Sequence, residues 1–220
     1  MNISILITDP THPINPLLEE WRNIMIKRGH NVSIYHKKSE CLAGGGGGDI
    51  LFLISCSSII GVNDRKRFNV SLVIHASDLP KGRGWSPHIW SILSGENVIH
   101  VCLLEAADAV DTGNIWLRDK FYLEGHELLP EINQKLFAVE LKLMTRAVNE
   151  FDNIIPIPQN DIFREEEYRK RRTPKDSKLD PYKSIASQFN LLRVADNERY
   201  PVFFEYMNKI YVLKIEKVII

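Results

Sequence analysis

The sequence predicts an open, mostly parallel α/β sheet followed by a small β-rich unit at the C-terminal end. Apolar runs of strand length alternate with helical patterns in the first part of the chain, as expected of successive β-α-β units. Near the C-terminus the pattern changes to period-two alternation, which is typical of paired strands. The 220 residues are 44% hydrophobic and 25% charged, which is usual for a folded globular protein.

The first β-α-β unit is indicated by helix start and stop signals and by the spacing of apolar residues. Residues 3–7 (ISILI) form a short apolar run, and Pro16 stands where the first turn of a helix tolerates proline. Apolar residues then recur at helical spacing until 28–30 (RGH), where a basic turn and a glycine end the helix. Residues 31–37 (NVSIYHK) alternate like a strand, so a right-handed crossover is expected.

Three further apolar runs read as buried parallel strands. They are 49–55 (DILFLIS), 71–75 (SLVIH) and 97–105 (NVIHVCLLE). A short helix is expected just before the last of these runs. The five glycines at 44–48 predict a loose loop, because glycine loses the most backbone entropy when it is ordered.

The last part of the chain contains a long helix, a charged arm and a β unit. Residues 128–151 keep helical spacing, and 165–181 (EEEYRKRRTPKDSKLDP) form a charged, irregular arm. The runs YPVFFEYM and KIYVLKIEKVII alternate with period two on either side of Asn208. We therefore predict a main domain at 1–165, followed by the arm and a small β unit at 166–220.

Composition excludes several classes of function. Lys+Arg and Asp+Glu both number 28, and this zero net charge argues against a dedicated nucleic-acid binder. The three cysteines lack metal-ligand spacing, so no metal site is predicted. Neither a signal-peptide pattern nor an apolar run of ~20 residues is present, so we expect a reduced, cytoplasmic protein with no membrane partner.

Polar residues follow several of the predicted strands. Ligands of open α/β sheets bind beyond the carboxyl ends of the strands. Asp9, the 56–58 stretch (Cys56, Ser57, Ser58) and His75 fall at such positions, and Asp108 and Asp111 follow the 97–105 run. A carboxylate can orient an imidazole base and favour its charged form. The pattern alone leaves His75 either as a structural residue or as the partner of Asp111 in a catalytic pair.

Two motifs in the right order resemble the folate-dependent formyltransferase family. HASDLPKGRGWSP at 75–87 contains that family's histidine, serine, Leu-Pro and Arg-Gly positions, and DTGNI at 111–115 resembles its Asp-Thr-Gly loop. The stretches 171–181 and 189–206 are similar to the corresponding parts of bacterial sugar N-formyltransferases. The tail at 196–217 resembles most the members that act on sugars of the pseudaminic acid or dideoxyamino type. The resemblance covers nearly the whole chain and implies a Rossmann-like formyltransferase fold, with 1–165 as the catalytic domain.

The resemblance also implies the chemistry and the site. A formyl group would move from N10-formyltetrahydrofolate to a primary amine, with His75 stabilising the oxyanion and assisting proton transfer, and Asp111 orienting His75. Gly82 and Gly84 would let the backbone approach the ligand closely. The folate would contact Cys56, Ser57, Ser58, Ala107 and Asp108, and the acceptor would contact Asp9, His12, Arg83 and Gly84.

One position departs from the family pattern. The family's asparagine two residues before the histidine is replaced by Val73, and losing one oxyanion donor can cost ~100-fold or more in rate. Either another donor substitutes, or the protein is a non-catalytic folate- or sugar-binding relative. Some sugar-formylating relatives carry an apolar residue at this position, which favours the first alternative, that another group donates to the oxyanion.

An amino sugar, as a precursor of a surface polysaccharide or a nonulosonic acid, is the expected acceptor. A methionyl-tRNA formyltransferase is the alternative, but it would normally be longer and have a basic surface for phosphates. The stretch Arg169–Arg172 could contact a substrate phosphate or carboxylate, or could be a solvated loop. The sequence leaves the oligomeric state open, with a homodimer as one arrangement.

Overall fold

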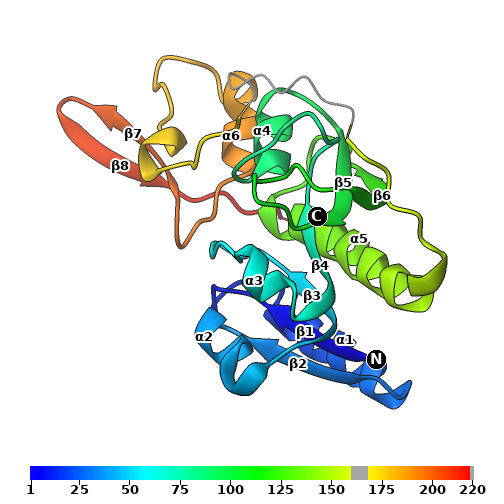
Figure 1. Cartoon of the computed structure of the whole chain (residues 1–220). Coiled ribbons are helices and arrows are strands. Elements are labelled where there is room, and N and C mark those ends of the chain that lie inside the picture. The colour runs from blue at the N-terminus through cyan, green and yellow to red at the C-terminus, as the bar shows by residue number, and fades with distance from the viewer. Residues whose placement is uncertain (160–167, 219–220) are drawn as a thin grey trace.

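The computed structural model describes residues 1–159 and 168–218 and contains a six-stranded sheet and a two-stranded sheet (Figure 1). The large sheet has the order β2-β1-β3-β4-β5-β6. Its strands are β1 (Asn2–Leu6), β2 (Asn31–Tyr35), β3 (Gly48–Leu53), β4 (Phe68–His75), β5 (Val98–Glu105) and β6 (Ile115–Tyr122). The small sheet pairs β7 (Val202–Tyr206) with β8 (Lys209–Leu213). The predicted fold class is confirmed.

The direction of β5 differs from the prediction. Strands β1 to β4 are parallel, but β5 runs antiparallel to β4, and β6 runs antiparallel to β5. A strand of a sheet that is covered on both faces has an apolar run whatever its direction, so the sequence of β5 did not show that the strand is antiparallel. Leu72 pairs with Glu105, so β5 ends beside the middle of β4. The loop 106–114 starts there and leads into β6.

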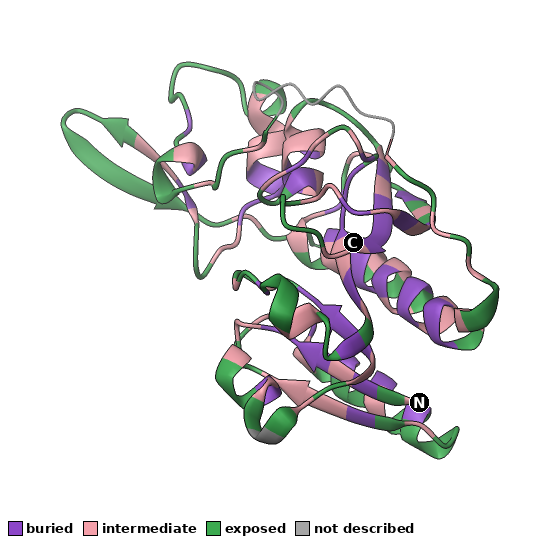
Figure 2. Cartoon of the chain, in the orientation of Figure 1, coloured by how far each residue is buried: buried purple, intermediate pink, exposed green. Residues whose placement is uncertain are grey.

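Helices α1 (Asn15–Lys27) and α5 (Leu129–Asn149) pack on the same face of the sheet and contribute to one hydrophobic core. Trp21 of α1 donates a hydrogen bond from Nε1 to Thr145 Oγ1 of α5 at 2.8 Å and packs edge-on against Phe52 of β3. Both helices were predicted, and Figure 2 shows buried residues at intervals along α5. Short helices complete the chain: α2 (Lys38–Cys41), α3 (Val62–Arg65), α4 (Pro87–Leu93) and α6 (Phe189–Arg193). Within the described residues, no helix is both long and apolar enough to span a membrane.

The glycine run is ordered, contrary to the predicted loose loop. Residues Ala43–Gly45 form a single 3₁₀ turn, and Gly48 already belongs to β3. A Cβ on Gly46 would lie 2.6 Å from the Cys41 carbonyl oxygen, and one on Gly48 would lie 2.7 Å from that of Asn2. Close backbone packing therefore explains why these positions lack side chains.

The C-terminal β unit is confirmed as a hairpin. Its turn residues Met207 and Asn208 have φ of 48° and 58°, as expected of the two-residue turns that match strand twist. The predicted boundary at 165/166 and part of the charged arm lie outside the described residues.

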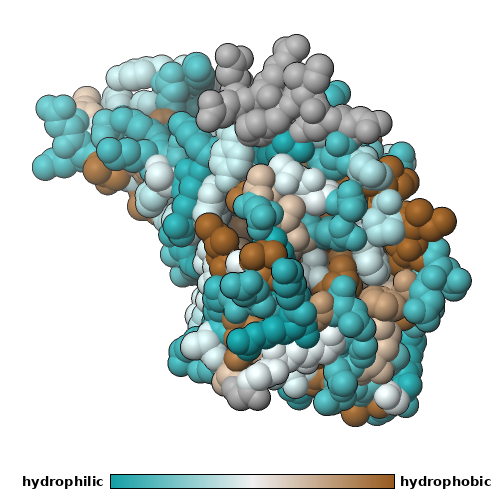
Figure 3. Space-filling view, viewed as in Figure 1, coloured by the Kyte–Doolittle hydropathy of each residue, from teal (hydrophilic) through white to brown (hydrophobic). Residues whose placement is uncertain are grey.

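On the face shown in Figure 3, hydrophobic side chains are scattered among hydrophilic ones.

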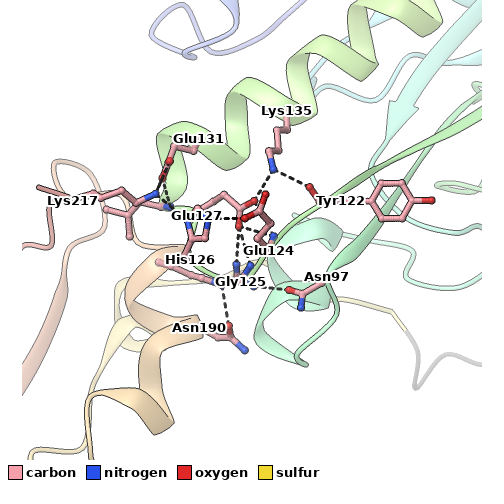
Figure 4. A network of polar contacts seen from close by, with 12 residues as sticks. Asn97, Tyr122, Glu124, Gly125, His126, Glu127, Glu131, Lys135, Asn190 and Lys217 are labelled. Carbon is pink, nitrogen blue, oxygen red and sulfur yellow. Dashed lines mark hydrogen bonds and ion pairs between the residues drawn. The ribbon is translucent and has the colours of Figure 1, made fainter. Parts of the chain in front are cut away.

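A polar network ties the C-terminal segment to the loop before α5 (Figure 4). Arg193 of α6 is 1% exposed and lies 3.7 Å from the carboxylate of Glu127, while Lys217 pairs with Glu131 at 2.6 Å. Burial opposes the charge of Glu127, but Lys135 and the backbone N–H groups of Glu124 and Gly125 together lower its pKa to about 2. The network therefore anchors the C-terminal segment through an ionised, buried carboxylate.

Candidate active site

A cavity of about 690 Å³ lies where the loops after β1, β3, β4 and β5 meet α4, α5 and the C-terminal segment. Most of the residues predicted as site residues line it: His12, Cys56, Ser57, Ser58, His75, Gly84, Ala107, Asp108 and Asp111. Asp9 and Arg83 are the predicted site residues that do not line it. The loops after the parallel strands β1, β3 and β4 meet as expected for carboxyl ends at one sheet edge. The loop after the antiparallel strand β5 reaches the same cavity from a strand that ends beside the middle of β4.

His75 ends β4 and meets Asp111 inside the cavity wall. Its Nδ1 lies 3.4 Å from Asp111 Oδ1, and both side chains are 7% exposed. Its Nε2 donates to the carbonyl oxygen of Gly82 at 2.9 Å. Both ring nitrogens thus face oxygen acceptors, which fixes the orientation of the imidazole.

The loop that carries Asp111 is held from two sides. Asp111 has a left-handed φ of 58°, and its Oδ2 accepts a hydrogen bond from the Gly84 N–H at 2.9 Å. Its carbonyl oxygen accepts from Arg83 Nε at 3.2 Å and from Gln159 Nε2 at 3.0 Å. Arg83 is 3% exposed, so these contacts place it behind the loop that carries Asp111. Its predicted role in acceptor binding stays a prediction, as does that of Gly84.

Gly84 lets two backbone segments meet. Its φ is 102°, and a Cβ there would collide with the carbonyl oxygen of Arg169. The Trp85 N–H donates to that oxygen at 2.8 Å, and the Arg169 N–H donates to the Arg83 carbonyl at 2.7 Å. The close neighbour at Gly84 is therefore the arm of the same chain, where the sequence suggested a ligand. Gly82 likewise faces the Ser77 side chain, which a Cβ would approach to 3.1 Å.

The two loops predicted to contact folate line the same cavity and are braced locally. The Ser57 N–H donates to Thr8 Oγ1 at 2.9 Å, which ties the 56–58 loop to the end of β1. Arg65 of α3 donates to the Ile60 carbonyl at 2.6 Å and pairs with Asp108 on the facing loop. Sequence reasoning missed Arg65, since a single arginine in a short polar segment carries no distinctive signal.

Two residues predicted to bind the acceptor lie in the β1–α1 loop. His12 packs against the Phe137 ring of α5 with centroids 5.8 Å apart, and its Nε2 lies 3.1 Å from Ser55 Oγ. Asp9 accepts a hydrogen bond from the Thr11 hydroxyl at 2.7 Å and pairs with Arg199 at 3.2 Å. These partners lower the pKa of Asp9, with the Thr11 hydrogen bond as the largest cause. The roles of both residues in acceptor binding stay predictions.

Two cavity residues whose pKa values are strongly shifted, His88 and Glu140, were missed from the sequence. Burial lowers the pKa of His88 on α4 to about 4, with smaller contributions from His75 and His12. Burial raises the pKa of Glu140 on α5 to about 8. A signal for Glu140 did exist, because it interrupts the apolar stripe of α5 at a core position between Leu136 and Leu143.

The motifs that contain His75 and Asp111 lie in a segment that matches a known family. A family model described as formyl transferase matches residues 46–148, which include both His75 and Asp111. The chain carries a formyl transferase domain. The methionyl-tRNA formyltransferase of Rickettsia prowazekii is 30% identical over 166 residues, which are 74% of this chain and 53% of that protein. The chain spans about half the length, or less, of the curated relatives it matches.

Several solved structures share the fold of this chain over nearly its whole length. A methionyl-tRNA formyltransferase from Clostridium thermocellum superimposes with a TM-score of 0.81 at 20% identity, covering 99% of this chain and 93% of that one. A 4-N formyltransferase from Francisella tularensis gives 0.74 at 17% identity, covering 99% and 98%. HypX from Aquifex aeolicus, solved in complex with tetrahydrofolic acid, gives 0.73 at 19% identity, covering 97% and 37%.

Proposed function

We propose that this protein is an N-formyltransferase that moves a formyl group from N10-formyltetrahydrofolate to the primary amine of an amino sugar. The observation that carries the proposal is the His75–Asp111 pair, 3.4 Å apart and shielded from water, in the wall of a large cavity. A positioned imidazole with an orienting carboxylate is the arrangement that general acid–base catalysis requires.

The cavity suits a folate donor. Its volume of about 690 Å³ falls within the range of small-molecule sites, ~300–1,000 Å³. Apolar residues such as Ile60 and Leu104 line it beside the polar 56–58 loop and Asp108, which is the mixed lining that an aromatic ring with polar edges needs. When bound, the donor supplies an activated formyl carbon.

His75 and Asp111 divide the catalytic work. As the acceptor nitrogen bonds to the formyl carbon, the carbon–N10 bond breaks and an amine proton must reach the departing nitrogen. His75 donates to the formyl oxygen as negative charge develops there and takes part in that proton transfer. In the present structure Nε2 donates to the Gly82 carbonyl, so exchanging that carbonyl for the formyl oxygen leaves the Asp111 contact intact.

An amino sugar is the acceptor we favour. A sugar N-formyltransferase from a Shewanella species is matched over 99% of its length, with a TM-score of 0.70 at 12% identity. The zero net charge of this chain also offers no basic surplus for tRNA phosphates. Methionyl-tRNA is the second candidate, because the curated sequence relatives with 30 to 32% identity are methionyl-tRNA formyltransferases.

A panel of acceptors tests the proposal. The protein is incubated with N10-formyltetrahydrofolate and 3-amino- or 4-amino-dideoxyhexoses, free and nucleotide-linked, or with methionyl-tRNA, and tetrahydrofolate and formylated product are quantified. Turnover with amino sugars supports the proposal. Turnover with methionyl-tRNA and with none of the sugars would show that the acceptor is methionyl-tRNA and not an amino sugar. Folate binding without any turnover would identify a non-catalytic relative.

A further inference from the structure

One face of α5 forms a wall of the cavity and carries a carboxyl group. Asn133, Leu136, Phe137 and Glu140 all line the cavity, and their spacing places them on one side of the helix. Glu140 is 8% exposed and continues the stripe that is otherwise apolar. A carboxyl group at a core position is costly unless something pairs with it.

Glu140 differs from the other carboxyl groups around the cavity. Asp108 pairs with Arg65, and Asp196 pairs with Arg199 at 2.7 Å. Asp111 and Glu105 are also engaged, the first by His75 and Gly84 and the second by Asn114 and Trp116. Among residues 1–159 and 168–218, none donates a hydrogen bond to Glu140 or forms an ion pair with it.

The cationic groups of the cavity are directed elsewhere. Arg199 pairs with Asp9 and Asp196, and Arg171 stacks over the Trp85 ring at 4.9 Å. Arg172 donates to the Asp176 carbonyl oxygen at 3.0 Å. Three histidines on other elements also line the cavity. His75 is held by Asp111 and by the Gly82 carbonyl oxygen, and burial lowers the pKa of His12 and of His88, which favours their neutral forms. No cation among residues 1–159 and 168–218 therefore pairs with Glu140, which leaves its carboxyl group available to a cationic group of a ligand.

We propose that Glu140 binds the amino group of the acceptor and removes its proton, an inference that rests on the proposed function. An amine in water is mostly an ammonium ion and has no free lone pair for attack. When the ammonium ion binds, Glu140 releases its own proton to water and forms an ion pair with the ligand. Glu140 then takes one N–H proton, which leaves a neutral amine and restores the acid, so that one proton in total passes to the solvent.

The pKa of about 8 suits this exchange, because proton transfer is efficient when donor and acceptor have similar proton affinities. A glutamine at position 140 would keep the shape and could still accept a hydrogen bond from the ammonium ion. It could not become an anion or take a proton. The Glu140→Gln variant therefore separates the charge of this residue from its size.

Calorimetry with methyl 4-amino-4,6-dideoxy-α-D-glucopyranoside as the probe tests the inference without turnover. Titration at pH 7 in two buffers of different ionisation enthalpy measures the protons released per bound amine. The wild-type protein should release about one proton and bind the N-acetylated probe roughly 10- to 100-fold more weakly. Glu140→Gln should lose the proton release and bind the amine roughly 10- to 100-fold more weakly than wild type. Glu150→Gln, the same change at the end of α5 in a residue paired with Arg146, should match wild type.

Three results would overturn the inference: equal wild-type affinity for the amine and its N-acetyl form, proton release that persists in Glu140→Gln, or no binding of the amine at millimolar concentration. The acceptor panel keeps this failure apart from failure of the proposed function. If the Glu140→Gln variant formylates sugars with the wild-type KM, the proposed role of Glu140 is wrong and the proposed function still stands. A panel with no turnover would reject the proposed function whatever the calorimetry shows.

Discussion

Replacing Glu140 by glutamine should change how the stability of the protein depends on pH. Burial raises the pKa of Glu140 from 4.5 to about 8, so the folded protein keeps a proton that the unfolded chain loses above pH 4.5. Stability linked to this group is fully present below pH 4.5 and is lost as the pH rises toward 8. The shift corresponds to up to ~5 kcal/mol of free energy of unfolding lost in the wild type at high pH.

The difference in free energy of unfolding between Glu140→Gln and the wild type reports on Glu140 alone. Urea denaturation at pH 5, 6, 7, 8 and 9 gives the free energy of unfolding of wild type, Glu140→Gln and Glu150→Gln. Contributions of the histidines and other groups cancel in the difference, so the stability of Glu140→Gln relative to wild type should rise steadily with pH. A difference that stays constant within ~0.5 kcal/mol from pH 5 to pH 9 would refute the reasoning. Glu150→Gln should show no such trend above pH 5.

Four further changes test other parts of the site and the fold. His75→Ala should lower turnover at least ~100-fold while circular dichroism shows a folded protein, and near-normal turnover would make His75 structural. Asp111→Asn keeps the shape but loses the charge, so the rate should fall more than ~10-fold, with a smaller effect on folate binding measured by fluorescence. Glu127→Gln should lower stability by ~2–3 kcal/mol at pH 7, and thermal melts should show this deficit shrinking as the pH falls from 4.5 toward 2, because the pKa of Glu127 is lowered. Val73→Asn should leave turnover nearly unchanged if another donor already serves the oxyanion, and a gain of ~100-fold would reveal a lost donor.

The sequence predicted the parts of the fold that depend on local pattern. Helices α1 and α5 and the C-terminal hairpin have strong periodicity, and they form where periodicity placed them. Strand β6 was missed, although Ile115, Leu117 and Phe121 are buried at period-two spacing. The direction of β5 could not be predicted, because burial on both faces produces the same apolar run in a parallel or an antiparallel strand.

The candidate site was predicted through its motifs and not through its supports. The pair of His75 and Asp111 followed from strand ends and the resemblance, and the structure brings the two side chains together. Gln159, which holds the Asp111 loop, and Arg169, which pairs with the backbone beside Gly84, come from distant segments. Such contacts depend on how the chain returns to the sheet, and no local pattern encodes that return.

The C-terminal segment also takes part in forming the cavity, which bears on how the chain is divided. Tyr168, Arg172 and Arg199 line the cavity together with the 56–58 loop and His75 of the formyl transferase domain. The segment is joined to the main sheet region by the backbone pairing at Gly84 and by the ion pair between Arg199 and Asp9. Side chains that recognise an acceptor must be held rigidly to be selective. We therefore expect that removing residues 166–220 would damage acceptor binding even if the predicted domain at 1–165 folded without them.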